Sequence, residues 1–259
     1  MESSIQQLMH LKLVLFFLTL LSCIGTRQLT NKDRIQINIP TPEAEAAYVW
    51  RNLQDIPFFE QHGYQVSLPS GMLIEELKQK VRDGNLPSED YGRLEQFIRD
   101  SVYQASDYQK GYEKIKAELA LINKMVNEIE PVNFDWTFKT FDTYQVNLTL
   151  YGPGGSYNPD EGSLLLFTTP QGQFKSYDNP ANTIIHEIVH IGIEESIIGQ
   201  HNVPHALKER IVDTFVSLHF GQYLPDYRVQ EMGDTRTDAY LKSVADFEEL
   251  DKVVEQVLK

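Results

Sequence analysis

The chain has 259 residues, of which 23 are Lys or Arg and 37 are Asp or Glu, giving a net charge of −14. This length suits one domain, or one domain with a helical extension, and is enough to bury a sizeable core. The acidic balance and the lack of any basic stripe argue against nucleic acid as a partner. Acidity would also repel anionic membrane surfaces, although it selects no substrate.

Residues 1–25 read as a targeting leader. An uncharged apolar run, 13–21, follows Lys12 and is too short for a comfortable membrane-spanning helix. The tetrapeptide ending at Cys23 (LLSC) resembles a bacterial lipoprotein lipobox, which would make acylated Cys23 the mature N-terminus and its lipid the only membrane contact. Ordinary signal cleavage after Gly25, giving a secreted or periplasmic protein, is the alternative. Either way we expect an extracytoplasmic protein of the cell envelope whose folded part has no cysteine.

The N-terminal half of the mature chain is expected to be mainly helical. Residues 26–40 look like a linker that ends in a short edge strand, 34–39, where apolar and polar residues alternate. A helix should follow over 42–55, with Pro at its first position. Shorter helices are expected over about 70–84 and from Ser88.

The clearest periodicity is a seam of apolar residues at steps of three and four, which predicts one long helix that ends at Pro131. We interpret this helix as one side of a helical layer; a dimer seam is the alternative. The seam consists of Tyr112, Ile115, Leu119, Ile122, Val126 and Ile129.

From Asn133 the sequence changes to strand-like segments. Residues 138–151 are rich in aromatic and β-branched side chains, and the glycines of 152–156 indicate a turn. The apolar run 163–169 predicts a buried strand.

Two histidines and a glutamate with H-E-x-x-H spacing follow in an otherwise apolar, helix-like run: His186, Glu187 and His190. Positions i and i+4 lie on one face of a helix, so both imidazoles can reach one metal ion. Glu187 can take a proton from a water molecule that the metal activates, without itself being a ligand. This spacing is the metalloprotease signature, with zinc as the metal.

A catalytic zinc site needs a third protein ligand and an open position. Glu194 continues the stripe of the two histidines, but it lies about 12 Å further along the same helix axis, so three collinear ligands would converge poorly. A second helix over about 202–218, with Asn202 as its cap, carries His205, Glu209 and Asp213 on one face. Glu209 is the better candidate for the third ligand. Asp213 could then hold the outer ring nitrogen of a ligating histidine.

The motif H-E-x-x-H, an 18-residue spacer and Glu209-x-x-x-Asp213 resemble the gluzincin, or thermolysin-like, branch of zinc metallopeptidases. The resemblance covers about 183–215. It departs from the usual pattern at Lys208, where that group has Asn, and at Arg210.

The resemblance implies one Zn²⁺ per chain, held by His186, His190 and Glu209, with Glu187 as general base and Asp213 supporting the first histidine. It also implies an α+β, zincin-like fold with an N-terminal helical layer, a small mixed sheet, the motif helix and a second ligand-bearing helix.

We therefore expect a single zincin-like domain over 41–259. Its parts would be a helical region (41–130), strands and active site (131–240), and a C-terminal helix (241–259). In zincin-like folds, the strand before the motif helix can form an edge that pairs with an extended substrate. Residues 163–169 are the candidate edge here, and a central core strand is the alternative.

The reaction would also need a donor for the developing oxyanion. The sequence offers His205, His219, Tyr223, Tyr227, Arg236 and Tyr240, of which Tyr240 and His205 are favoured. The expected function is amide-bond cleavage in a peptide or protein substrate. A non-catalytic cell-envelope binding or assembly protein with a structural metal is the alternative, and an amidase acting on cell-wall amides is a third possibility. The oligomeric state stays open.

Overall fold

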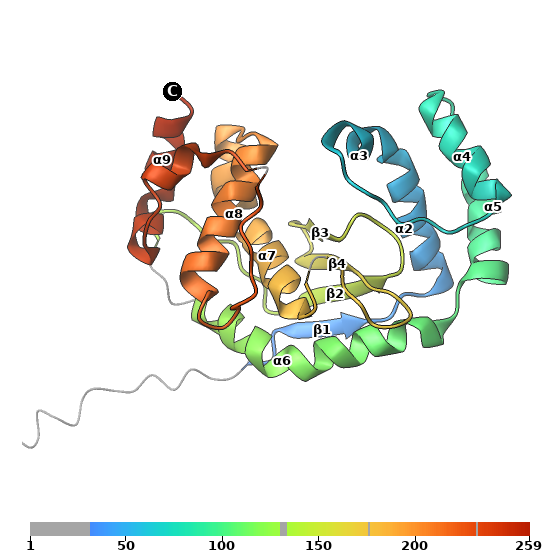
Figure 1. The fold of residues 1–259 in the computed structure, drawn as a ribbon, viewed down its shortest axis with the longest axis horizontal. Helices are drawn as coiled ribbons and strands as arrows, with labels where there is room; N and C mark the ends of the chain where they lie inside the picture. The colour runs from blue at the N-terminus through green and yellow to red at the C-terminus, as the bar shows by residue number, and fades with distance from the viewer. Residues whose placement is uncertain (1–31, 130–133, 176, 232) are drawn as a thin grey trace, which may run out of the picture. The chain divides into compact units, whose positions relative to one another are not determined.

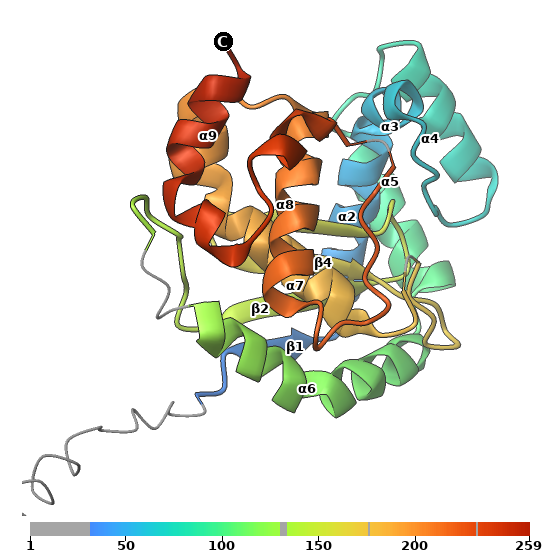
Figure 2. The ribbon, with the colours of Figure 1, turned by 60° about the vertical axis from the view of Figure 1, so that its left-hand side comes forward.

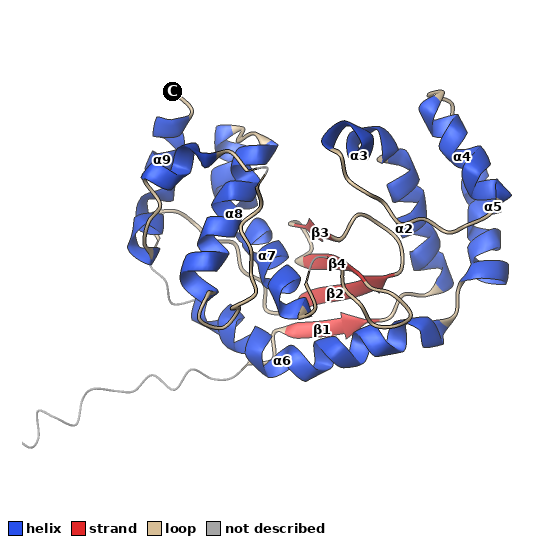
Figure 3. Ribbon diagram, viewed as in Figure 1, coloured by secondary structure: helices blue, strands red, loops and turns tan. Residues whose placement is uncertain are grey.

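The computed structural model describes residues 32–259, apart from 130–133, 176 and 232 (Figure 1). The expected leader and Cys23 lie outside this range. The described part is α+β, with eight α-helices and a four-stranded mixed sheet, as the sequence predicted. Figure 3 shows the strands gathered in one small sheet with helices around it. Within the described ranges, no helix is long and apolar enough to cross a membrane.

The sheet has the strand order β1-β2-β4-β3. Strands β1 (Ile35–Asn38), β2 (Tyr144–Thr149) and β4 (Ser163–Phe167) run parallel, and β3 (Gly155–Asn158) pairs antiparallel with β4. The prediction of an edge strand before residue 40 is confirmed, since β1 forms one edge.

The prediction that 163–169 forms an edge is wrong, and the alternative of a central strand is confirmed. Strand β4 lies between β2 and β3, so it is a central strand, and β3 forms the edge instead. Strand β3 falls partly in the segment expected to be a turn. Gly152 and Gly154 make that turn with φ of 133° and 154°, values that L side chains rarely adopt. The strand after them is short and half-buried throughout, so it lacks the alternation by which strands are recognised.

The N-terminal helices form a layer with a hydrophobic core of its own. They are α2 (Pro42–Gln54), α3 (Ile56–His62), α4 (Met72–Arg82) and α5 (Asp90–Phe97). The start predicted for the first helix is confirmed, because the Thr41 hydroxyl accepts a hydrogen bond from the Ala44 amide. Helix α3 was not predicted. The core of this layer contains Ala46, Val49, Leu53, Ile56, Ile74, Leu77, Leu94 and Ile98.

The long helix α6 (Gln109–Ile129) is confirmed as part of a helical layer, since it packs against β1 and α7. Its seam residues Ile115 and Ile122 are fully buried in the single chain, so they are not free to form a dimer seam. Helix α6 and helix α7 (Pro180–Ile193) together cover one face of the sheet, because α7 contacts β3 and β4.

Helix α7 begins where the Asn179 side chain accepts a hydrogen bond from the Ala181 amide, with Pro180 at the first helical position. Helix α8 (His205–Phe220) lies beside α7 (Figure 2). It starts three residues later than predicted, because Asn202 adopts a left-handed conformation with φ of 52° and Pro204 stands at the cap. The C-terminal part is a 3₁₀ turn followed by a short helix, α9 (Leu250–Val257).

Two glycines allow a matched test of packing. A Cβ atom on Gly192, in α7, would lie 2.0 Å from the ring of Phe138, whereas a Cβ on Gly92, in α5, would meet nothing within 4 Å. We expect Gly192→Ala to lower the free energy of unfolding by about 1–3 kcal/mol through overpacking. Gly92→Ala should raise it by about 0.5–1 kcal/mol through helix propensity.

Thermal unfolding of both variants measures these effects, with about 2–4 °C expected per kcal/mol for a domain of this size. Equal melting temperatures for the two variants would contradict the packing at Gly192.

Candidate metal centre

The helical repeat of α7 brings its two histidines onto one face, as the sequence predicted. The Nε2 atoms of His186 and His190 lie 3.0 Å apart. Helix α8 crosses nearby and adds Glu209, whose Oε2 lies 3.5 Å from the Nε2 of His186 and 3.4 Å from that of His190. These three residues are a group that could hold a metal ion.

The spacing of the three atoms fits a tetrahedral metal ion. Zinc–ligand bonds of about 2.0–2.2 Å at tetrahedral angles place ligand atoms about 3.3–3.6 Å apart. Both distances to Glu209 fall in this range, and the distance between the imidazoles is a few tenths of an ångström shorter. The donor set, two imidazoles and one carboxylate, is the kind that leaves a fourth position for water or substrate.

Burial sets the protonation of these groups. Burial raises the pKa of Glu187 to about 7 and lowers that of His190 to about 4. Burial opposes the charge on His186, but hydrogen bonds with Asp213 and Glu209 outweigh it and raise its pKa to about 10. Burial alone would raise the pKa of Glu209, and hydrogen bonds with both histidines instead hold it far below its usual range. A cation among these three groups would compete with protons for the same lone pairs.

The ring of His186 is oriented from behind by two residues. Asp213 lies 3.3 Å from its Nδ1, as expected, and the hydroxyl of Tyr227 contacts both of these groups from one side. That hydroxyl donates to Asp213 at 2.7 Å and lies 2.7 Å from Nδ1 of His186, so it accepts the Nδ1 proton. The lone pair of Nε2 then faces the candidate metal position.

The segment after α8 also holds the carboxylates. The backbone amide of Gln230 donates to Asp213 at 2.7 Å, and its side-chain amide donates to Oε2 of Glu209 at 3.2 Å. The sequence offers Tyr227 as a candidate oxyanion donor. Its hydroxyl instead lies behind the ligand, where it positions His186.

His190 is held differently. Its Nδ1 is buried and has no hydrogen-bond partner among the described residues. Its ring stacks on Tyr157 of β3, with centroids 4.8 Å apart and planes 7° from parallel. The Tyr157 hydroxyl donates to Glu194 at 2.6 Å and accepts from Lys208 at 2.9 Å. Glu194, the alternative ligand on the motif helix, is therefore engaged with Tyr157 and stays outside the ligand group.

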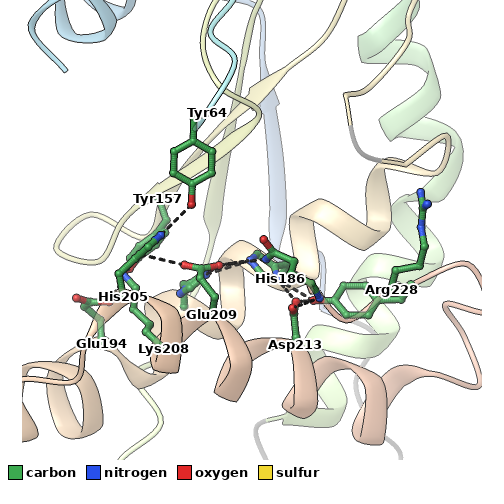
Figure 4. A network of polar contacts seen from close by, with 12 residues as sticks. Tyr64, Tyr157, His186, Glu194, His205, Lys208, Glu209, Asp213 and Arg228 are labelled. Carbon is green, nitrogen blue, oxygen red and sulfur yellow. Dashed lines mark hydrogen bonds and ion pairs between the residues drawn. The ribbon is translucent and has the colours of Figure 1, made fainter. Parts of the chain in front are cut away.

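The ligands open into a cavity of about 680 Å³ between the N-terminal helices, strand β3 and helix α8. Figure 4 shows Tyr64, His205 and Glu209 following one another toward His186. Residues from α2, α3 and the loop after α3 contribute to the wall, so the site extends beyond the region 131–240 that the sequence indicated. They are Arg51, Asn52, Asp55, Phe58, Phe59 and Tyr64.

Strand β3 presents a free edge to this cavity. The hydrogen bond from the Phe167 amide to the Gly154 carbonyl fixes the alternation of β3 against β4. The amide and carbonyl groups of Gly155 and Tyr157 therefore point away from β4, and no described strand lies beyond them. Gly155 also has to be small, because a Cβ there would lie 2.1 Å from Oε1 of Glu187.

Of the two favoured donors, only His205 lines the cavity. Its Nε2 lies 2.8 Å from the Tyr64 hydroxyl, and its Nδ1 lies 3.6 Å from Oε1 of Glu209. Tyr240 is away from the cavity, half-exposed, with its hydroxyl accepting a hydrogen bond from Gln256. Three other candidates are also engaged elsewhere. His219 bonds to Phe215, Tyr223 to Glu128, and Arg236 to Asp234.

The sequence reasoning missed Tyr64 and Tyr157. Tyr64 lies far from the motif along the chain, and Tyr157 lies on β3, which begins inside the expected turn 152–156, so no local pattern indicated either residue.

Comparison with known proteins finds no match to a family model, to a curated protein or to a solved structure. The candidate centre therefore stands on its own geometry.

The choice of third ligand can be tested directly. Glu209→Ala removes an oxygen that lies within 3.5 Å of both imidazoles. Zinc affinity should fall by more than about 100-fold, which is the largest loss typical of a residue that only supports a ligand. Glu194→Ala is the matched control and should change affinity little. Titration of zinc against a chromophoric chelator measures both, and a larger loss in Glu194→Ala would move the third ligand to the motif helix.

Tyr227→Phe tests the support behind His186. Losing the hydroxyl removes one acceptor for the Nδ1 proton, while Asp213 remains 3.3 Å away, so a loss of about tenfold in zinc affinity is expected. Tyr223→Phe is the control, since its hydroxyl donates to Glu128 away from the cavity. Equal affinities in the two variants, from the same chelator titration, would show that Tyr227 does not support the ligand.

Proposed function

We propose that the protein is a zinc-dependent metallohydrolase, most directly a peptidase, of gluzincin type in a zincin-like fold. The observation that carries the proposal is the convergence of three ligand atoms at 3.0–3.5 Å from one another beside a buried glutamate in an open cavity. His186, His190 and Glu209 would hold the metal. The order of the motif helix and a second ligand-bearing helix supports the gluzincin assignment.

A zinc ion held by three protein ligands activates a water molecule and polarises an amide carbonyl. Glu187 would accept the proton of that water and pass it to the leaving amine. Burial disfavours its charged form, which suits a residue that must both take and give a proton near neutral pH. Because Gly155 leaves no side chain against it, the Glu187 carboxylate can face the cavity.

A peptide substrate would bind along the free edge of β3. The outward amide and carbonyl groups of Gly155 and Tyr157 can pair with an extended backbone, which is strand addition. This edge runs past both Glu187 and His190, so a peptide bound there would pass the metal position. Pairing with an extended substrate, expected from the sequence for 163–169, is thus proposed for β3.

Charge that develops on the carbonyl oxygen needs a donor in the cavity. The hydrogen-bonded pair of Tyr64 and His205 is suited to this, because both side chains line the cavity and His205 lies against Glu209. His205 keeps the role that its position in the sequence suggested, and Tyr64 is added to it.

The competing proposal is a non-catalytic envelope protein with a structural metal, which would need a fourth protein ligand. Among the described residues the ligand group has three members. His205 and Glu194, the two candidates for a fourth ligand, lie outside that group, and Glu194 accepts a hydrogen bond from Tyr157. These contacts favour the enzyme. A peptide library assayed beside cell-wall amides would then separate a peptidase from an amidase.

Glu187→Gln tests the catalytic proposal. The amide keeps the size of the side chain but cannot accept the proton, so zinc should be retained and hydrolysis should fall at least about 100-fold. Zinc content and turnover of a cleaved library peptide are measured together, with Glu231→Gln, on a loop outside the cavity, as the control. Unchanged turnover in Glu187→Gln would rule out the general-base role.

We also propose that the protein works outside the cytoplasm, anchored by a lipid on Cys23. This rests on the leader-like sequence 1–25. Cys23→Ala should move the protein from the membrane fraction to the soluble fraction of fractionated bacterial cells. A variant that stays with the membranes would contradict the lipid anchor.

A further inference from the structure

Four aromatic rings, three of which line the cavity, form one cluster that we call the aromatic wall: Phe58 and His62 of α3, Tyr64, and His205 of α8. The Phe58 ring lies against His62 with centroids 4.2 Å apart and faces Tyr64 at 6.2 Å. The His205 ring meets the other three edge-on, at 5.5 Å from His62 and at 6.1 and 6.2 Å from Phe58 and Tyr64. These distances lie in the range at which aromatic rings attract one another.

The aromatic wall is next to the candidate metal ligands. His205 lies within 3.6 Å of Glu209, and Phe58, Tyr64 and His205 line the same cavity as Glu187. Figure 4 shows Tyr64 and His205 pointing toward Glu209. A group bound against the wall would therefore lie beside the amide that the centre is proposed to cleave.

Two polar groups of the wall bond to each other and a third bonds to the backbone, so an apolar ligand would contact ring faces rather than these atoms. The Tyr64 hydroxyl and Nε2 of His205 share a hydrogen bond, and Nδ1 of His62 bonds to the Phe58 carbonyl. Phe58 is 44% exposed, one of five large hydrophobic residues that are exposed in the described part of the chain. It is the only one of those five that lines this cavity. A ligand that covered the Phe58 ring would remove apolar surface from water.

We propose that the aromatic wall is the subsite for an aromatic side chain of the substrate, on the side of the scissile amide that faces α3. This rests on the proposed function. Aromatic side chains suit such a wall better than charged ones, because rings in offset or edge-on contact stabilise one another by more than the burial of their apolar surface contributes. Phe58 is then a specificity-determining residue, whereas Glu187 and the ligands serve any peptide.

The test uses two hydroxamic acids, which chelate zinc without being cleaved: acetohydroxamic acid and 3-phenylpropanohydroxamic acid. Their dissociation constants are measured by calorimetry on the zinc-loaded protein, on Phe58→Ala and on Met72→Ala. Met72 is the matched control, because it is an exposed apolar residue outside the cavity. Phe58 is itself exposed, so its replacement should leave the fold intact, and a melting curve checks this.

We expect the phenyl compound to bind the parent protein at least about tenfold more tightly than acetohydroxamic acid, the low end for filling an apolar pocket. Phe58→Ala should reduce that preference to about threefold or less, and Met72→Ala should keep it. Equal binding of the two compounds by the parent, or an unchanged preference in Phe58→Ala, would overturn the subsite while the metal centre stands. If neither compound binds the zinc-loaded protein, the metal centre and the subsite fail together.

Discussion

The site depends on the burial of two imidazoles and a carboxylate within 3.5 Å of one another, in a core that is otherwise apolar. Buried ionisable groups are unfavourable unless they pair or bind a cation. Here the burial shifts the protonation equilibria, since the pKa of His186 is raised and the pKa of His190 is lowered. A divalent cation at the centre of the three atoms would satisfy all of them at once.

The surroundings of the centre can be understood from this constraint. Helix α7 is buried on almost every side, so its two candidate ligands are rigidly placed, and α8 brings the carboxylate of Glu209 close to both. The segment after α8 returns to the site and supplies Tyr227 and Gln230, which hold His186, Asp213 and Glu209 by hydrogen bonds. The two helices thus fix the positions of the candidate ligands, and the segment after α8 fixes the orientation of their side chains.

The sequence predicted the group of candidate ligands better than its surroundings, for a physical reason. His186 and His190 face one direction because the helical repeat requires it, and Glu209 follows once α8 is recognised as a second helix with a polar stripe. Tyr64 and Tyr157 reach the site only through tertiary packing, which local periodicity does not report. Tyr240 lies outside the cavity for the same reason: it follows the 3₁₀ helix Thr235–Ala239, and its hydroxyl accepts a hydrogen bond from Gln256 of α9.

Zinc K-edge X-ray absorption on the zinc-loaded protein tests the central claim most directly. The predicted spectrum is that of a four-coordinate ion with nitrogen and oxygen neighbours at about 2.0–2.2 Å and the outer scattering of two imidazole rings. An octahedral shell of oxygen atoms without imidazole scattering would contradict the assignment of His186, His190 and Glu209. A protein that retains no zinc would contradict the metal centre itself.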